Sequence, residues 1–184
     1  QVFNLANVAA GAVREVTPDA EVGLYSYYKH SAPPAFPLES NVRVWVIPYA
    51  FNQFPASPEG TIREWTRHAE NLGIYDYWAI TQWKKCRPRF DFVDRPRARV
   101  RLWHDAGVRG VSLETSASAG AVGLGLYLGA RLMWETGTDV EAELDEFYRR
   151  CFGEAAEPMR RMLERWAKHY SDSEHMLALS FRDL

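Results

Sequence analysis

The stretch GIYDYWAI, residues 73–80, is a short apolar run that opens with a glycine and carries one carboxylate, Asp76. Its length and its aromatic and aliphatic residues predict a strand. An acid between two tyrosines, followed by Trp78, is typical of a strand that ends at a sugar-binding site. The same pattern also occurs in ordinary strands that hold a hydrogen-bonded acid, so this stretch alone leaves both interpretations open.

Strand-like and helix-like patterns alternate along the chain on both sides of this stretch. Runs rich in β-branched and aromatic residues predict four strands, at about 22–28, 42–48, 74–79 and 109–114. Apolar residues at helical spacing predict helices at 3–16, 61–73, 93–106, 121–135, 140–151 and from near Pro158 into the 170s. Asp139 is predicted to cap the helix at 140–151. Strands that alternate with helices are typical of a parallel sheet with helices packed outside it, so the predicted fold class is α/β.

Length and composition place the chain among globular domains. It has 184 residues, of which 47% are hydrophobic, and a formal net charge of −2. We therefore expect neither nucleic acid nor a membrane as a partner. The apolar runs are shorter than the roughly 18 residues that span a bilayer. The first residues lack the basic segment of a signal peptide, and the absence of an initiating Met indicates a processed or excised piece.

The sequence contains no motif for a cofactor or a metal ion. The two cysteines, Cys86 and Cys151, lie in different predicted elements. They lack the C-x-x-C spacing of zinc and redox sites, so free thiols are favoured over a disulfide. The glycine-rich phosphate and dinucleotide loops, the G-x-S-x-G turn and the H-E-x-x-H motif are all missing. We therefore predict no cofactor and no metal.

Aromatic and polar residues gather at the predicted carboxyl ends of the strands, where the loops of parallel α/β folds form the ligand site. The predicted ligand contacts are Tyr27, His30, Asp76, Tyr77, Trp78 and Glu114. Further groups of this kind follow at 49–53, 82–83 and 115–116. The structural alternatives are a buried acid at Asp76, core residues at Tyr77 and Trp78, and a solvated loop residue at His30.

Several segments of the chain match the pattern of a known family. They are FNLANVAA at 3–10, VGLYSYYKHSAPP at 22–34, NVRVWV at 41–46, LGIYDYWAI at 72–80, AGVRGVSLET at 106–115 and YLGARLMWETGTDVEAELDEFYRRCFGEAAEPM at 127–159. The last segment is the most specific of them. With these segments the chain resembles the C-terminal part of the domain-of-unknown-function family 4838, which occurs in large carbohydrate-active proteins of bacteria.

The resemblance implies a (β/α)8 barrel related to family 20 hexosaminidases and, more distantly, to family 67 glucuronidases. A whole barrel has eight strands, so the chain would be the C-terminal half of a TIM-like barrel. The half-barrel would occupy 1–136, with a helical extension at 137–184. The main catalytic acid would precede residue 1, which leaves the catalytic residues unknown. The pattern of family 20 would place groups that hold the N-acyl arm of the substrate at Asp76 and Tyr77, and an acid that binds sugar hydroxyls at Glu114.

The sequence therefore predicts part of a glycoside hydrolase-like protein, hexosaminidase-like or glucuronidase-like, that acts on or binds glycans. The alternative is a non-catalytic carbohydrate-binding or structural barrel fragment. The expected partners are a glycan substrate and either the missing N-terminal part of the barrel or a second copy, because both outer strands would have open edges. The localisation stays open, and the resemblance suggests a secreted or periplasmic bacterial protein.

Overall fold

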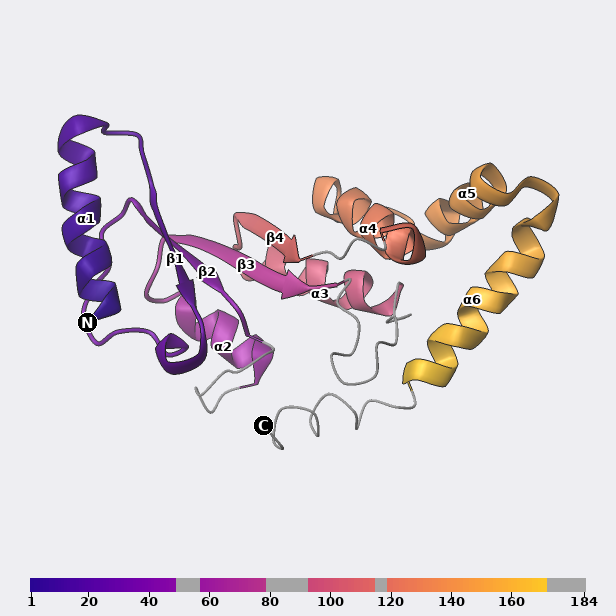
Figure 1. The fold of residues 1–184 in the computed structure, drawn as a ribbon, viewed down its shortest axis with the longest axis horizontal. Helices are drawn as coiled ribbons and strands as arrows, with labels where there is room; N and C mark the ends of the chain where they lie inside the picture. Colours follow the sequence, from indigo (N-terminus) through magenta and orange to yellow (C-terminus); the bar gives the residue numbers. More distant parts are fainter. Residues whose placement is uncertain (49–56, 79–92, 115–118, 172–184) are drawn as a thin grey trace. The chain divides into compact units, whose positions relative to one another are not determined.

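The computed structural model describes residues 1–48, 57–78, 93–114 and 119–171 (Figure 1). The elements in chain order are α1 (Val2–Val16), β1 (Val22–Ser26), the 3-10 helix η1 (Tyr28–His30), β2 (Val42–Val46), α2 (Pro58–Trp65), β3 (Asn71–Tyr77), α3 (Asp94–Asp105), β4 (Gly110–Glu114), α4 (Ala119–Trp134), α5 (Val140–Phe152), the 3-10 helix η2 (Gly153–Ala155) and α6 (Ala156–Ser171). The chain divides into two compact units, residues 1–76 with 102–113 and residues 77–101 with 114 onward. The predicted division at residue 137 stays a prediction.

The first unit is built on a four-stranded sheet whose strand order, β1-β2-β3-β4, follows the sequence. β1 pairs with β2 in parallel, with Tyr25 opposite Trp45, and β2 pairs with β3 in parallel, with Trp45 opposite Gly73. The backbone N–H of Arg109, just before β4, donates to the carbonyl oxygen of Leu72 in β3 at 2.8 Å. The predicted α/β class, with a four-stranded parallel sheet and flanking helices, is confirmed.

One face of the sheet is apolar and buried. Alternate residues of β2 lie on it, namely Val42, Val44 and Val46, together with Leu72 and Ile74 of β3. Helices α1 and α2 complete this core with the buried residues Phe3, Ala6, Ala10, Ile62 and Trp65. The rings of Phe3 and Trp65 join the two helices, with centroids 5.5 Å apart. Full burial of each aliphatic side chain contributes about 1.5–3 kcal/mol, so this face carries most of the packing energy of the unit.

The opposite face of the sheet carries Tyr25, Trp45 and Tyr75, which we call the aromatic face. The Trp45 indole of β2 lies over glycines of β3 and β4. A Cβ added at Gly73 would lie 2.5 Å from Trp45 Cε3, and one added at Gly110 would lie 3.2 Å from Trp45 Cη2. Side chains essentially never approach as closely as the first of these distances, so the indole requires glycine at position 73. The Tyr25 and Tyr75 rings meet edge to face, with centroids 5.4 Å apart.

The helix predicted at 61–73 is wrong at both ends. α2 begins directly after Ser57, whose side chain caps its amino end. The helix ends at Trp65, and Gly73 lies inside β3 instead of at a helix end. The glycine that has the pattern of a helix stop is in fact the residue against which Trp45 packs.

The strand predicted at 22–28 is two residues shorter in the structure. β1 ends at Ser26. Two residues later, Tyr28 has a φ of +51°, which an extended strand cannot accommodate. The chain therefore leaves the sheet earlier than the run of tyrosines indicates.

Helices α4, α5 and α6 form most of the second unit. Asp139 caps α5, as predicted, because its carboxylate accepts hydrogen bonds from the backbone N–H groups of Glu141 at 3.0 Å and Ala142 at 3.2 Å. The Trp78 indole packs against Gly129 of α4, where an added Cβ would overlap the ring. No helix in the described ranges is long and apolar enough to span a bilayer.

Ion pairs connect the helices of the second unit. The Arg160 guanidinium on α6 contacts three carboxylates, those of Glu141 at 2.9 Å, Asp145 at 2.5 Å and Glu164 at 2.8 Å. Arg97 of α3 binds the same Glu141 at 2.7 Å. Hydrogen bonds from Arg97 and then from Arg160 lower the pKa of Glu141.

The prediction of free thiols is confirmed for the cysteine that the structure describes. Cys151 lies on α5, is exposed and has a free thiol. Cys86 lies outside the described residues.

Candidate functional site

One buried carbonyl group anchors the loop after β1. The carbonyl oxygen of Ser31 accepts hydrogen bonds from Ser26 Oγ at 3.0 Å and from Trp65 Nε1 at 2.9 Å. Within the loop, the backbone N–H of His30 donates to the carbonyl oxygen of Tyr27 at 2.9 Å. Because Ser26, Ser31 and Trp65 are all buried, the backbone of the loop is tied to the core of the first unit.

This anchored loop presents several aromatic and basic side chains at the carboxyl end of β1. Tyr27 is half-buried, whereas Lys29 and His30 are exposed. The His30 ring meets the Phe3 ring edge to face, with centroids 6.4 Å apart. Tyr28 is 46% exposed, and the Lys29 ammonium lies 6.0 Å from the centroid of its ring. The predicted ligand contacts here were Tyr27 and His30, and they did not include the exposed Tyr28.

Asp76 lies on the buried face of the sheet and is only 1% exposed. Side chains alternate between the faces of a strand, so Asp76 follows Leu72 and Ile74, while Tyr75 and Tyr77 point to the opposite side of β3. A buried carboxylate is stable only with polar partners. This position favours the structural alternative for Asp76 over contact with a ligand.

The three other predicted contacts belong to the second unit. Tyr77 is half-buried, and its carbonyl oxygen accepts a hydrogen bond from Arg95 Nη1 at 2.9 Å. Trp78 is 6% exposed and packs on Gly129, which favours the core alternative for this residue. Glu114 is the last residue of β4 and is half-buried.

The six predicted contacts are thus divided between the units. Tyr27, His30 and Asp76 belong to the first unit, and Tyr77, Trp78 and Glu114 to the second. Their grouping on one ligand-binding surface stays a prediction. The further groups predicted at 49–53, 82–83 and 115–116 lie outside the described residues.

The aromatic face is the feature of the first unit that sequence reasoning missed. Tyr25 is 53% exposed. The Arg43 guanidinium lies 6.0 Å from the Trp45 ring and is held by Glu21, with nitrogen–oxygen distances of 2.6 and 2.8 Å. The hydrogen bond from Arg43 also lowers the pKa of Glu21. The sequence signal for the aromatic face was a glycine in each of β1, β3 and β4, together with Trp45 in β2.

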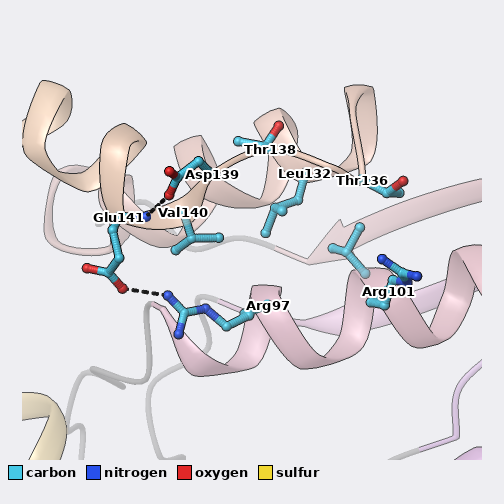
Figure 2. A pocket seen from close by; sticks show the side chains of 9 residues that line it. Arg97, Arg101, Leu132, Thr136, Thr138, Asp139, Val140 and Glu141 are labelled. Atoms are coloured by element: carbon cyan, nitrogen blue, oxygen red, sulfur yellow. Dashed lines mark hydrogen bonds and ion pairs between the residues drawn. The ribbon is translucent and has the colours of Figure 1, made fainter.

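A cavity of about 340 Å³ lies within the second unit, between α3 and the start of α5 (Figure 2). Buried Val100, Leu132 and Val140 form part of its lining. At its edge, the Arg97 guanidinium binds the Glu141 carboxylate (Figure 2). This pair compensates its own charges, so the cavity offers no net charge of one sign from these two residues.

Groups of acidic, histidine or cysteine side chains that could hold a metal ion do not occur among the described residues.

The family model of the domain of unknown function DUF4838 matches residues 1–164. The chain therefore belongs to this family, as the resemblance in its sequence indicates. No curated protein and no solved structure matches it significantly.

Proposed function

We propose that this member of the DUF4838 family is the C-terminal half of a glycoside hydrolase-like (β/α)8 barrel and binds a glycan at the carboxyl ends of its strands. The strand order β1-β2-β3-β4 is the observation that supports it. Right-handed crossovers between consecutive parallel strands place their helices on one face of the sheet. Barrels are built in this way, whereas doubly wound sheets reverse the strand order and cover both faces.

The unequal faces of the sheet support the same proposal. The face with Val44 and Ile74 is buried beneath α1 and α2, whereas Tyr25 on the aromatic face is half-exposed. In a closed barrel a face such as the aromatic face points inward, and further strands close the barrel around it. Those strands would come from an N-terminal part of the barrel or from a second copy, which would also pair with the open edges of β1 and β4.

The acids at the strand ends support a binding role for this chain. Glycosidases use two carboxyl groups about 5–9.5 Å apart. Asp76 is buried, and Glu114 is the one acid among the terminal residues of the four described strands. We assign Glu114 to sugar hydroxyls, to which a carboxylate hydrogen bond contributes about 1.5–3 kcal/mol. The main catalytic acid would then come from outside this chain.

Titration calorimetry with chitobiose, cellobiose, xylobiose and methyl β-glucuronide tests the proposal. We expect the chain to bind at least one of these sugars, and Glu114→Gln to weaken that binding about tenfold or more, because a neutral amide replaces the charged acceptor. Glu15→Gln, on the exposed side of α1, should leave the affinity unchanged. Asp76→Asn should lower the melting temperature and also leave the affinity unchanged.

Two results would contradict the proposal. One is a parent chain that binds none of the four sugars. The other is a Glu114→Gln variant that binds with the affinity of the parent. The aromatic residues at the strand ends would then have a purely structural role.

A further inference from the structure

The cavity of about 340 Å³ in the second unit has a lining that includes none of the six predicted ligand contacts. Cavities that bind small molecules usually measure about 300–1,000 Å³ and combine apolar walls with a few polar groups. This cavity lies at the lower end of that range. Its size therefore suits a small ligand, comparable with a single sugar ring, better than a long chain.

The walls of the cavity are aliphatic. Val100 of α3, Leu132 of α4 and Val140 of α5 line it, and all three are buried. Figure 2 shows the side chains of Leu132 and Val140 pointing from α4 and α5 toward α3. Walls of this kind favour contact with C–H groups and disfavour a charge between them.

An ion pair forms one edge of the cavity. Arg97 Nη2 donates to Glu141 Oε1 at 2.7 Å (Figure 2), and the two side chains are 47% and 60% exposed, so a ligand can reach both from solvent. A guanidinium only donates hydrogen bonds, and a carboxylate only accepts them. A ligand hydroxyl can do both at once with this pair. Because the two charges compensate each other, the edge favours a neutral polar group over an ion.

The acceptor of this pair is held in place by further ion pairs. Arg160 binds Glu141 at 2.9 Å and is itself held by Asp145 at 2.5 Å and Glu164 at 2.8 Å. Hydrogen bonds from Arg97 and then from Arg160 lower the pKa of Glu141, so it is a charged acceptor at neutral pH. Groups that are already oriented lose less conformational freedom when a ligand binds.

We propose that this cavity binds a neutral monosaccharide, with the C–H groups of the sugar against the aliphatic walls and its hydroxyls bonded to Arg97 and Glu141. A pyranose combines both requirements, since its ring carries C–H groups and its edge carries hydroxyls that donate and accept hydrogen bonds. This site goes beyond the proposed function. It uses none of the residues assigned to the strand ends, so the two sites can be tested separately.

Titration calorimetry of the full chain with methyl β-glucopyranoside and methyl β-xylopyranoside tests the inference. We expect at least one of them to bind with a dissociation constant below about 10 mM. Arg97→Gln should weaken that binding about tenfold, because a charged donor is lost. Its melting temperature should stay close to that of the parent, since Arg160 still holds Glu141.

Two further variants serve as controls. Arg161→Gln removes an arginine from another exposed ion pair, that with Glu157 on α6, and should leave the affinity unchanged. Leu132→Phe places a larger side chain on the cavity wall and should weaken binding at least as much as Arg97→Gln. Its melting curve shows whether the variant is folded.

The outcomes separate this inference from the proposed function. A parent that binds neither methyl glycoside, or an Arg97→Gln variant that binds with the affinity of the parent, would overturn the inference. If Glu114→Gln weakens the binding and Arg97→Gln does not, the sugar binds at the strand ends, and only the proposed function stands. If the methyl glycosides bind through Arg97 and Glu114→Gln changes no affinity, this inference stands and the proposed function fails.

Discussion

The two compact units each contain a tryptophan packed on a glycine, but they differ in what surrounds that contact. The first unit has a dense buried core, whose fully buried side chains include Val42, Val44, Val46, Ile62, Trp65, Leu72, Ile74 and Trp103. In the second unit, no described side chain of α6 is buried, and the helices are joined by ion pairs of Arg160 and Arg131. The first unit therefore has more fully buried side chains, whereas in the second unit ion pairs add to an apolar core that includes Leu128, Leu132 and Leu144.

Because of this difference, we expect the stability of the two units to be sensitive to different changes. Dense cores respond to changes in volume and shape, whereas exposed ion pairs contribute little each and are weakened by salt and acid. The first unit also has surface pairs, such as Arg43 with Glu21, but its strands and helices are held by buried apolar residues.

The largest expected effect compares a core tryptophan with a surface tryptophan. Trp65 is 0% exposed and donates to the Ser31 carbonyl, whereas Trp166 on α6 is 42% exposed. We expect Trp65→Ala to lower the free energy of unfolding by about 3–5 kcal/mol, as is usual for buried aromatic residues. Trp166→Ala should cost less than about 1 kcal/mol. Chemical denaturation of both variants measures the difference, and equal losses would remove the contrast between the units.

The second prediction tests the shape of the aromatic face. Gly73→Ala places a Cβ 2.5 Å from the Trp45 ring, so the indole or the strand must move. Overpacking of this kind costs about 1–3 kcal/mol. Gly23→Ala is the matched control, because its Cβ would lie 3.6 Å from Trp45 Nε1, an ordinary contact. A melting temperature of Gly73→Ala equal to that of Gly23→Ala would show that Trp45 does not lie flat on β3.

The smallest expected effect is the stability that the second unit loses at low pH. Glu143 accepts hydrogen bonds from Arg131 and from the Tyr127 hydroxyl, at 2.6 and 2.5 Å, and these bonds lower its pKa. A carboxyl whose pKa is lower in the folded state stabilises the protein above its unfolded pKa, about 4.3. That stabilisation is lost as the pH falls through the folded pKa.

Melting curves between about pH 6 and pH 3 measure this effect. We expect Glu143→Gln to lose less stability on acidification than the parent, since the variant no longer binds the proton. Glu15→Gln, which removes an exposed carboxylate of the first unit, controls for the general change in charge. Equal acid sensitivity of Glu143→Gln and the parent would contradict a contribution of charge to the second unit.

Local sequence signals predicted the elements and the family, whereas the grouping of the site residues stays a prediction. Asp139 was recognised as a helix cap because capping depends on residues two or three positions away. The burial of Trp78 against Gly129 could not be read from the sequence, since these residues lie far apart in the chain and meet only through packing. The prediction of sugar contacts at Asp76 and Trp78 therefore combined two residues that the structure buries.

The order of strands and helices in this protein follows from local sequence patterns, because period and capping act over a few neighbouring residues. The role of Gly73, by contrast, depends on tertiary packing. Its spacing resembles a helix stop, but the register between β2 and β3 sets it opposite Trp45. The burial of Asp76 also depends on tertiary packing. Because side chains alternate between the faces of a strand, the sequence places Asp76 and Tyr77 on opposite faces, but it does not say which face the helices cover. Long-range packing makes that choice, and no local pattern contains it.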